Sequence, residues 1–214
     1  MPAGRRHGRK DVRRAARHAG FSLMELMVGV TILGILLAIA LPSFGEWVRN
    51  NQVRTAAESL REGLQLARSE AVKRNARMRL QMVTTVDNSC ALSTAGPYWV
   101  VNMGASVTAA GGCGGVVSST VSPFIVQTAP VTAGTARVVV QASGTAVAFD
   151  AAGRQSATTN PTSAVGLFTV DVSSAAGECL PTGDVRCLRV LVTPAGQVRM
   201  CDRRVTAATD PARC

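Results

Sequence analysis

The chain contains one long run of hydrophobic side chains close to its first residues. From residue 21 to residue 45 the sequence reads FSLMELMVGVTILGILLAIALPSFG, and Glu25 is the only charged residue in it. A helix of this length can cross a hydrocarbon core of roughly 30 Å. The run therefore predicts a transmembrane helix over residues 21–45.

A second pattern, with a helical period, follows this run. Its apolar residues recur three or four positions apart, which predicts an amphipathic helix over residues 46–77 with one face against a core. These apolar residues are Val53, Ala57, Leu60, Leu64, Ala67 and Ala71. The whole helix should run from about Phe21 to about Ala76. Pro42 should interrupt and bend it, because proline removes one backbone hydrogen bond.

Beyond Met78 the period of the pattern changes to two, as in half-buried strands. The candidate strands are 79–83, 98–102, 123–127, 137–141, 145–150, 167–172, 187–193 and 197–201. Gly, Ser, Asn and Pro separate them, and residues 94–122 should hold a long loop. The predicted fold class is α+β, in which a long N-terminal helix, transmembrane in its first half, packs on antiparallel β-sheets. These sheets form a β-rich domain over residues 78–214.

The net charge of +10 favours a nucleic-acid partner at first sight. The position of the charge argues against this interpretation, because residues 1–20 carry a net +6 and the other 194 residues only +4. Positive charge before an apolar run places the N-terminus in the cytoplasm. The C-terminal body is then expected on the other side of the membrane.

Both histidines, His7 and His18, lie in the basic segment. If that segment is removed, the mature chain has no histidine. This excludes His-based catalytic triads, Cys–His dyads and His-ligated metal sites. We therefore expect neither an enzyme nor a protein that binds a metal or a cofactor.

All six cysteines follow the apolar run, and none forms a C-x-x-C pair, so zinc and thioredoxin-type sites are disfavoured. An even number beyond a membrane segment suits disulfides in an oxidising compartment. Several free buried thiols are the alternative, and the number of cysteines leaves many connectivities open. Sequence neighbours are expected to pair: Cys90 with Cys113, Cys179 with Cys187, and Cys201 with Cys214.

Three interpretations of the apolar run compete. An ordinary transmembrane anchor leaves Glu25 unexplained. A secretory signal peptide could be cut at Ala38-Ile39-Ala40, but it would need a very long charged region before it. The third interpretation rests on Gly20-Phe21-Ser22-Leu23-Met24-Glu25-Leu26, which resembles the type III signal of type IV pilins and pseudopilins. The resemblance implies that prepilin peptidase removes a leader, residues 1–20, after Gly20, and that the new first residue, Phe21, is N-methylated.

The same resemblance implies a role for Glu25 in assembly. A carboxylate near the bilayer interior costs about 2.5–3.5 kcal/mol on insertion scales, so it usually has a partner. Cleavage after Gly20 creates one, the positively charged amine of Phe21. In the pilin family the glutamate is thought to meet the N-terminus of a neighbouring subunit. The alternative is a Glu25 side chain that reaches the membrane surface.

Three further segments are similar to the GspH/FimT family of minor pseudopilins and pilins. They read LQLARSEAVKRN at 64–75, FDAAGR at 149–154 and GQVRMCD at 196–202. The resemblance implies a pilin-like fold, in which the first segment ends the helix and the third forms the last strand.

The family includes two functions. GspH-type members belong to the pseudopilus of type II secretion, whereas FimT-type members belong to type IV pili, and some resemble DNA receptors with Gly-Arg-x-Arg in the last strand. Here the segment reads Gly196-Gln197-Val198-Arg199, so the first arginine is missing. Gln197 and Arg199 would lie on one side of a strand, and Arg203, Arg204 and Arg213 could join them on DNA phosphates. Acidic neighbours, and no nearby aromatic residue to stack on bases, favour a solvated basic tail instead.

These observations predict a minor pseudopilin of the type II secretion system that helps to initiate or cap a periplasmic filament. Its expected partners are prepilin peptidase, other pseudopilins or pilins, and the inner membrane. The alternative is a FimT-like minor type IV pilin that binds DNA for natural transformation or supports pilus assembly.

Overall fold

The computed structural model describes residues 22–129 and 137–214. The cleavage and methylation positions, Gly20 and Phe21, lie outside the described residues. The chain divides into two compact units, Met1–Pro42 and Ser43–Cys214.

One helix, α1 (Leu23–Arg74), crosses from the first unit into the second. Its bounds differ by two residues at each end from the prediction. The helix continues through Pro42, as expected of one helix from about residue 21 to about residue 76. A proline inside a helix removes one hydrogen bond, and its ring clashes with the carbonyl group four residues earlier, so it can bend a helix without ending it. The predicted bend at this residue, where the two units meet, stays a prediction.

In the first unit, α1 carries large apolar side chains on all its faces, and these are exposed. Leu23 and Ile39 are 77% and 70% exposed. By length and hydropathy alone, no single helix among the described residues qualifies as a membrane span. The segments Leu23–Ile39 and Phe44–Arg74 qualify only when they are taken together.

The C-terminal end of α1 is a Schellman motif. Asn75 has a φ of 50°, its amide donates to Val72 O at 3.3 Å, and the amide of Ala76 donates to Ala71 O at 3.1 Å. Asparagine tolerates the left-handed conformation that usually requires glycine, and these two bonds satisfy carbonyls at the end of the helix. The chain therefore turns directly from α1 into the first strand.

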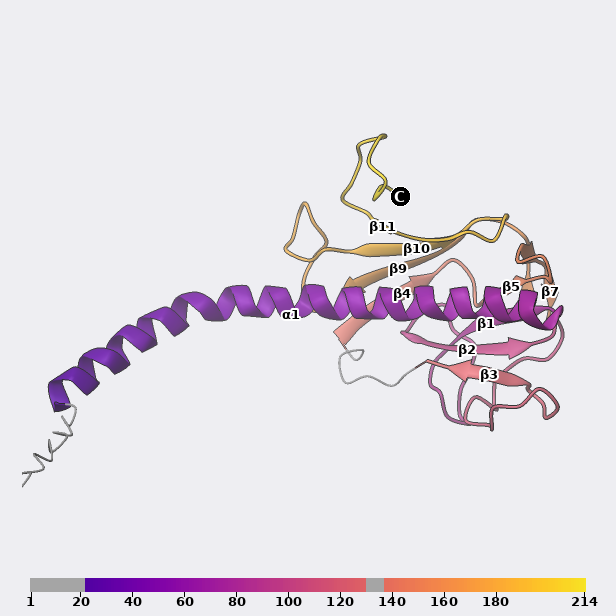
Figure 1. Ribbon diagram of the computed structural model, residues 1–214, viewed down its shortest axis with the longest axis horizontal. Helices are drawn as coiled ribbons and strands as arrows, with labels where there is room; N and C mark the ends of the chain where they lie inside the picture. The colour runs from indigo at the N-terminus through magenta and orange to yellow at the C-terminus, as the bar shows by residue number, and fades with distance from the viewer. Residues whose placement is uncertain (1–21, 130–136) are drawn as a thin grey trace, which may run out of the picture. The chain divides into compact units, whose positions relative to one another are not determined.

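Two antiparallel sheets form most of the second unit (Figure 1). The five-stranded sheet has the order β3 (Ile125–Thr128), β2 (Tyr98–Met103), β1 (Met78–Val83), β5 (Ala146–Phe149) and β6 (Gln155–Ser156). The four-stranded sheet has the order β11 (Val198–Asp202), β10 (Leu188–Val192), β9 (Phe168–Ser174) and β4 (Val138–Ala142). A small hairpin joins β7 (Thr158–Thr159) to β8 (Thr162–Ser163). The α+β prediction is confirmed.

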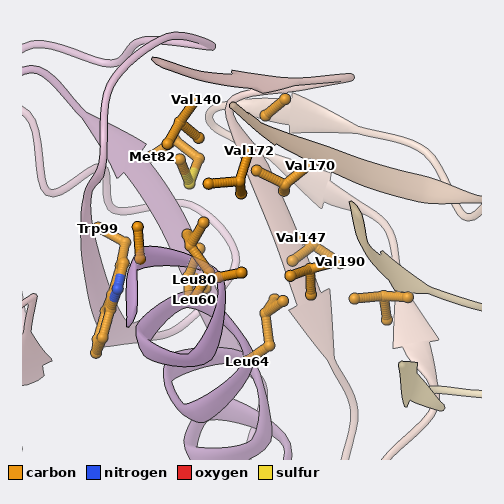
Figure 2. Close-up of a cluster of buried hydrophobic side chains, with 14 of the residues drawn as sticks. Leu60, Leu64, Leu80, Met82, Trp99, Val140, Val147, Val170, Val172 and Val190 are labelled. Atoms are coloured by element: carbon orange, nitrogen blue, oxygen red, sulfur yellow. The ribbon is translucent and has the colours of Figure 1, made fainter. Parts of the chain in front are cut away.

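The core lies where the second half of α1 meets the inner faces of both sheets (Figure 2). All six residues of the predicted apolar stripe are at most 1% exposed. Leu60 and Leu64 meet Leu80 and Met82 of one sheet and valines of the other. Gly63 allows Trp99 to lie close to the helix, because a Cβ at this position would be 2.8 Å from the indole ring. One helix thus joins the two sheets into a single core.

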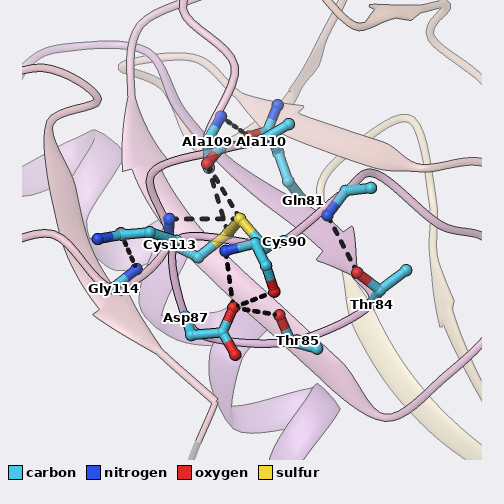
Figure 3. The surroundings of a disulfide bond; sticks show 12 residues. Gln81, Thr84, Thr85, Asp87, Cys90, Ala109, Ala110, Cys113 and Gly114 are labelled. Carbon is cyan, nitrogen blue, oxygen red and sulfur yellow. Dashed lines mark hydrogen bonds between the residues drawn. A yellow bond between two sulfur atoms is a disulfide. The ribbon is translucent and has the colours of Figure 1, made fainter.

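The outer face of the five-stranded sheet is covered by a loop that a disulfide holds. Cys90 is bonded to Cys113, and both are buried with Val83, Val100 and Ile125 in a second apolar cluster. The amide of Ala109 donates to Gln81 Oε1 at 2.7 Å (Figure 3). Because of this cover, every residue of β1 is buried, and the prediction of a half-buried strand there is wrong.

Candidate functional site

Glu25 lies in the first turn of α1 and is exposed. Ser22 caps this turn, since its Oγ accepts the amide of Glu25 at 3.2 Å and its carbonyl accepts the amide of Leu26 at 3.1 Å. Among the described residues, the carboxylate of Glu25 has no hydrogen-bond or ion-pair partner. Ser22 and Glu25 also have the Ser-x-x-Glu spacing of a capping box, a role that the sequence analysis missed.

The three segments that resemble the GspH/FimT family meet at one place in the second unit. Arg68 of α1 donates from Nε to the carbonyl oxygen of Gly153 at 3.0 Å. Gly153 and Gly196 both have positive φ, 72° and 80°, and a Cβ on Gly196 would overlap that same carbonyl oxygen. The amide of Gln155 donates to Pro194 O at 3.1 Å and strengthens the contact between the two turns. These segments therefore share a structural role, the junction between the helix and the two sheets.

The four arginines proposed for DNA contact lie around β11 and the tail that follows it. Arg199 is exposed on β11, and its Nη2 donates to Pro211 O at 3.3 Å. Arg203 is 3.7 Å from Asp171 Oδ1, and the amide of Arg204 donates to Asp202 Oδ1 at 2.9 Å. Gln197 is exposed and lies one residue before β11, where its carbonyl accepts the amide of Thr193 at 3.0 Å.

Asp202 is a buried carboxylate in this region, only 4% exposed. Burial favours its neutral form, but the hydrogen bond from Arg186 Nε at 2.7 Å and the amide of Arg204 outweigh it, so the pKa of Asp202 is held below its usual value. Asp202 is thus an anion that compensates part of the basic charge near β11.

A pocket of about 410 Å³ lies between the beginning of the second unit's helix and the β10–β11 pair. Trp47, Asn50, Met200 and Asp202 are among its lining residues. Trp47 is 62% exposed, and its ring lies 5.8 Å from that of Phe44. The prediction that no aromatic residue lies near the basic cluster is therefore wrong. The fold brings Trp47 to β11 across about 150 residues of sequence.

A loop closed by the Cys179–Cys187 disulfide borders this pocket. Its residue Asp184 forms an ion pair with Arg49 of α1, and the amide of Arg186 donates to Asn50 Oδ1 at 2.7 Å. The third disulfide joins Cys201 to Cys214 and ties the tail back to β11. The expectation that sequence neighbours pair is confirmed for all three disulfides.

Polar groups are also buried on the outer face of the five-stranded sheet. Arg79 is fully buried, and burial lowers its pKa to about 10. Its Nε donates to Asn102 Oδ1 at 2.9 Å, and its Nη1 donates to Asn160 O at 2.6 Å. This arginine fastens the β7–β8 hairpin to the sheet. No group of three or more potential metal ligands occurs within 22–129 and 137–214.

A family model described as "Type II transport protein GspH" matches residues 56–196, about two thirds of the chain. The chain belongs to the GspH family. A second model, the prokaryotic N-terminal methylation motif, matches residues 15–41. The GspH match contains Arg68, Gly153 and Gly196, so it includes the junction described above. The methylation motif implies processing by prepilin peptidase and pilin-like assembly.

This GspH family member also resembles fimbrial proteins over a short part of its length. It is 43% identical over 47 residues to the "Type IV major fimbrial protein FimA" of Dichelobacter nodosus, and 47% identical over 45 residues to a "Fimbrial protein" of Moraxella nonliquefaciens. These matches cover 22% and 21% of this chain and 29% of each relative. The chain thus matches less than a third of the length of these relatives.

Among solved structures, the type IV minor pilin FimU of Pseudomonas aeruginosa is similar to this GspH family member. The crystal structure in space group P21 aligns with a TM-score of 0.43 and 18% sequence identity, covering 72% of this chain and 91% of FimU. A second crystal form, in space group P65, aligns with a TM-score of 0.40 and 17% identity, covering 69% and 90% of the two chains.

Proposed function

We propose that this protein is a minor pseudopilin of a type II secretion system, a structural subunit that helps to initiate or cap a periplasmic pseudopilus. The observation that carries this proposal is the GspH match over residues 56–196, which follows a methylation motif at 15–41. The chain combines an N-terminal segment of pilin type with a folded β-rich body. A subunit of this design needs no cofactor and no reaction of its own.

The processing and location belong to the same proposal. Prepilin peptidase cuts after Gly20, Phe21 is methylated, and the apolar segment anchors the chain in the inner membrane with its N-terminus in the cytoplasm. The net charge of +6 before the apolar run supports this orientation. Three disulfides beyond that run suit a periplasmic body. The subunit then moves from the membrane into the filament.

Deletion of the gene in its own host tests the system to which the subunit belongs. If the protein is a type II pseudopilin, folded exoproteins should accumulate in the periplasm, and pili and natural transformation should remain normal. Immunoblots of periplasm and medium measure the first effect, and electron microscopy and transformation counts measure the second. Normal secretion together with loss of pili or transformation would contradict the proposal and favour the type IV pilus.

A DNA-binding minor pilin is the second candidate, and Trp47 is the observation that favours it. An exposed indole beside basic residues is a typical platform for single-stranded bases. Arg199 is exposed on the adjacent strand, but Arg203 lies near Asp171, and Asp202 is an anion. Fewer unpaired arginines are therefore available for DNA contact than the sequence suggested.

If this candidate is correct, the full chain in detergent should retard an oligonucleotide in a gel at low salt. Retardation should weaken as salt rises, because binding to phosphates releases counterions. The double variant Arg199→Ala and Arg203→Ala should lose most of the retardation, whereas Arg61→Ala, an exposed arginine of α1, should keep it. Equal retardation by the double variant and Arg61→Ala would remove this surface as the DNA site.

A further inference from the structure

The outer edge of β11 is available for pairing over part of its length. In the antiparallel pair β10–β11, Thr193 donates to Gln197 O at 3.0 Å and Arg203 donates to Cys187 O at 3.4 Å. Backbone groups alternate in direction along a strand, so the amides and carbonyls of Val198 and Met200 face away from β10. Among the described residues, no backbone hydrogen bond meets these outward groups.

The C-terminal tail covers only one end of this edge. The outward amide of Asp202 donates to Ala212 O at 2.8 Å, and the Cys201–Cys214 disulfide holds the tail at that end. Figure 1 shows β11 at the border of its sheet, with the tail beyond its last residue. Among the described residues, the tail therefore pairs with β11 at Asp202, and no segment pairs with it beside Val198 and Met200.

The pocket of about 410 Å³ lies directly inside this edge. Met200 borders it from the strand, and Trp47 and Asn51 border it from α1. A segment that pairs with β11 would alternate its side chains between solvent and this pocket. The edge supplies backbone hydrogen bonds, and the pocket supplies a place for an apolar side chain of the added segment.

The charges around the edge select the kind of segment. The two arginines that line the pocket are paired, Arg54 with Glu58 and Arg186 with Asp202, so the unpaired positive charge lies on the edge itself. Arg199 is exposed in the middle of β11, and Arg213 lies opposite Asp202 in the tail. A second copy of β11 would bring Arg199 close to its own equivalent, which like-charge repulsion disfavours. An acidic segment would instead meet the exposed cations of Arg199 and Arg213.

We propose that the β11 edge of this protein binds an extended acidic segment of a neighbouring filament subunit by β-strand addition. Main-chain hydrogen bonds to Val198 and Met200 supply the pairing, and the arginines around the edge select an acidic sequence. The inference rests on the proposed function only in naming the partner as a filament subunit. Binding by the isolated chain tests the edge itself, and the filament to which the chain belongs does not affect that result.

The probe is a fluorescent eight-residue peptide of alternating valine and glutamate, titrated into the full chain in detergent. We expect binding that slows hydrogen exchange at the amides of Val198 and Met200. Met200→Pro removes the outward amide without removing a bond to β10, so it should weaken binding roughly five- to tenfold, the effect of about one hydrogen bond. Met200→Ala keeps the amide and is the matched control. Its loss of binding free energy should be less than half of the loss caused by Met200→Pro.

Several outcomes would overturn the proposal. These are equal affinity for a valine–lysine peptide, no protection at Val198 and Met200, and unchanged binding by Met200→Pro. Dimers formed through β11 would identify a second copy of the chain as the partner that binds the edge. An oligonucleotide that competes with the peptide and binds more tightly than the peptide would identify nucleic acid as the partner instead. If Met200→Pro does not fold, a peptide with N-methylated alternate amides tests the same hydrogen bonds with the unaltered protein.

Discussion

Glu25→Gln should leave the processed protein in the membrane fraction and reduce its incorporation into filaments at least about tenfold. We propose that Glu25 pairs with the amine of a neighbouring subunit's Phe21. Each of these charges alone would cost several kcal/mol in an apolar setting, and pairing would offset both costs. A neutral amide keeps the size and polarity of the side chain but lacks the charge that matches the amine. The measurement is the ratio of protein in sheared or overexpressed filaments to protein in the membrane.

Ser22→Ala separates this assembly role from helix capping. It removes the 3.2 Å bond between Ser22 Oγ and the Glu25 amide but keeps the carboxylate. The loss of a cap costs about 1 kcal/mol of helix stability, so filaments should still contain this variant. N-terminal sequencing must find Phe21 first in every variant, because an uncut leader would prevent assembly for a different reason. Normal incorporation of Glu25→Gln would refute the pairing.

Gly196→Ala should destabilise the folded body by about 2–4 kcal/mol, the second large effect. Gly196 has a φ of 80°, which disfavours any side chain, and its new Cβ would overlap the carbonyl oxygen of Gly153. That carbonyl cannot move freely, because Arg68 donates to it at 3.0 Å. For a body of this size the melting temperature should fall by roughly 5–15 °C.

Gly166→Ala is the control for this prediction, because no atom lies within 4 Å of a Cβ built at Gly166. Its melting temperature should change little. Circular dichroism of both variants in the same detergent provides the comparison. If Gly196→Ala melts at the same temperature as the wild type, the turns at Gly153 and Gly196 can separate at little cost. The junction would then contribute little to stability.

Local patterns account for the parts of the fold that the sequence predicted well. The apolar stripe of α1 has a regular period, and each of its residues is at most 1% exposed. The eight longer strands coincide with predicted segments because each has a run of alternating or apolar residues. Neighbouring cysteines pair because short loops bring them together. The strands β6, β7 and β8 have only two residues each, too few for a period to be seen.

The remaining features depend on contacts between distant residues. Arg79 is typical of an exposed strand position, and only the β7–β8 hairpin and the disulfide-held loop make it buried. Trp47 lies near β11 because α1 packs beside the four-stranded sheet. No local pattern contains this information.

The three disulfides close separate loops, with sequence separations of 23, 8 and 13 residues, and no loop encloses a cysteine of another. If the body is exported from the residues next to the apolar run onward, both cysteines of each disulfide emerge before any cysteine of the next disulfide. Each disulfide can therefore form during export. The order in which the cysteines emerge does not favour mispaired disulfides, which an isomerase would have to correct.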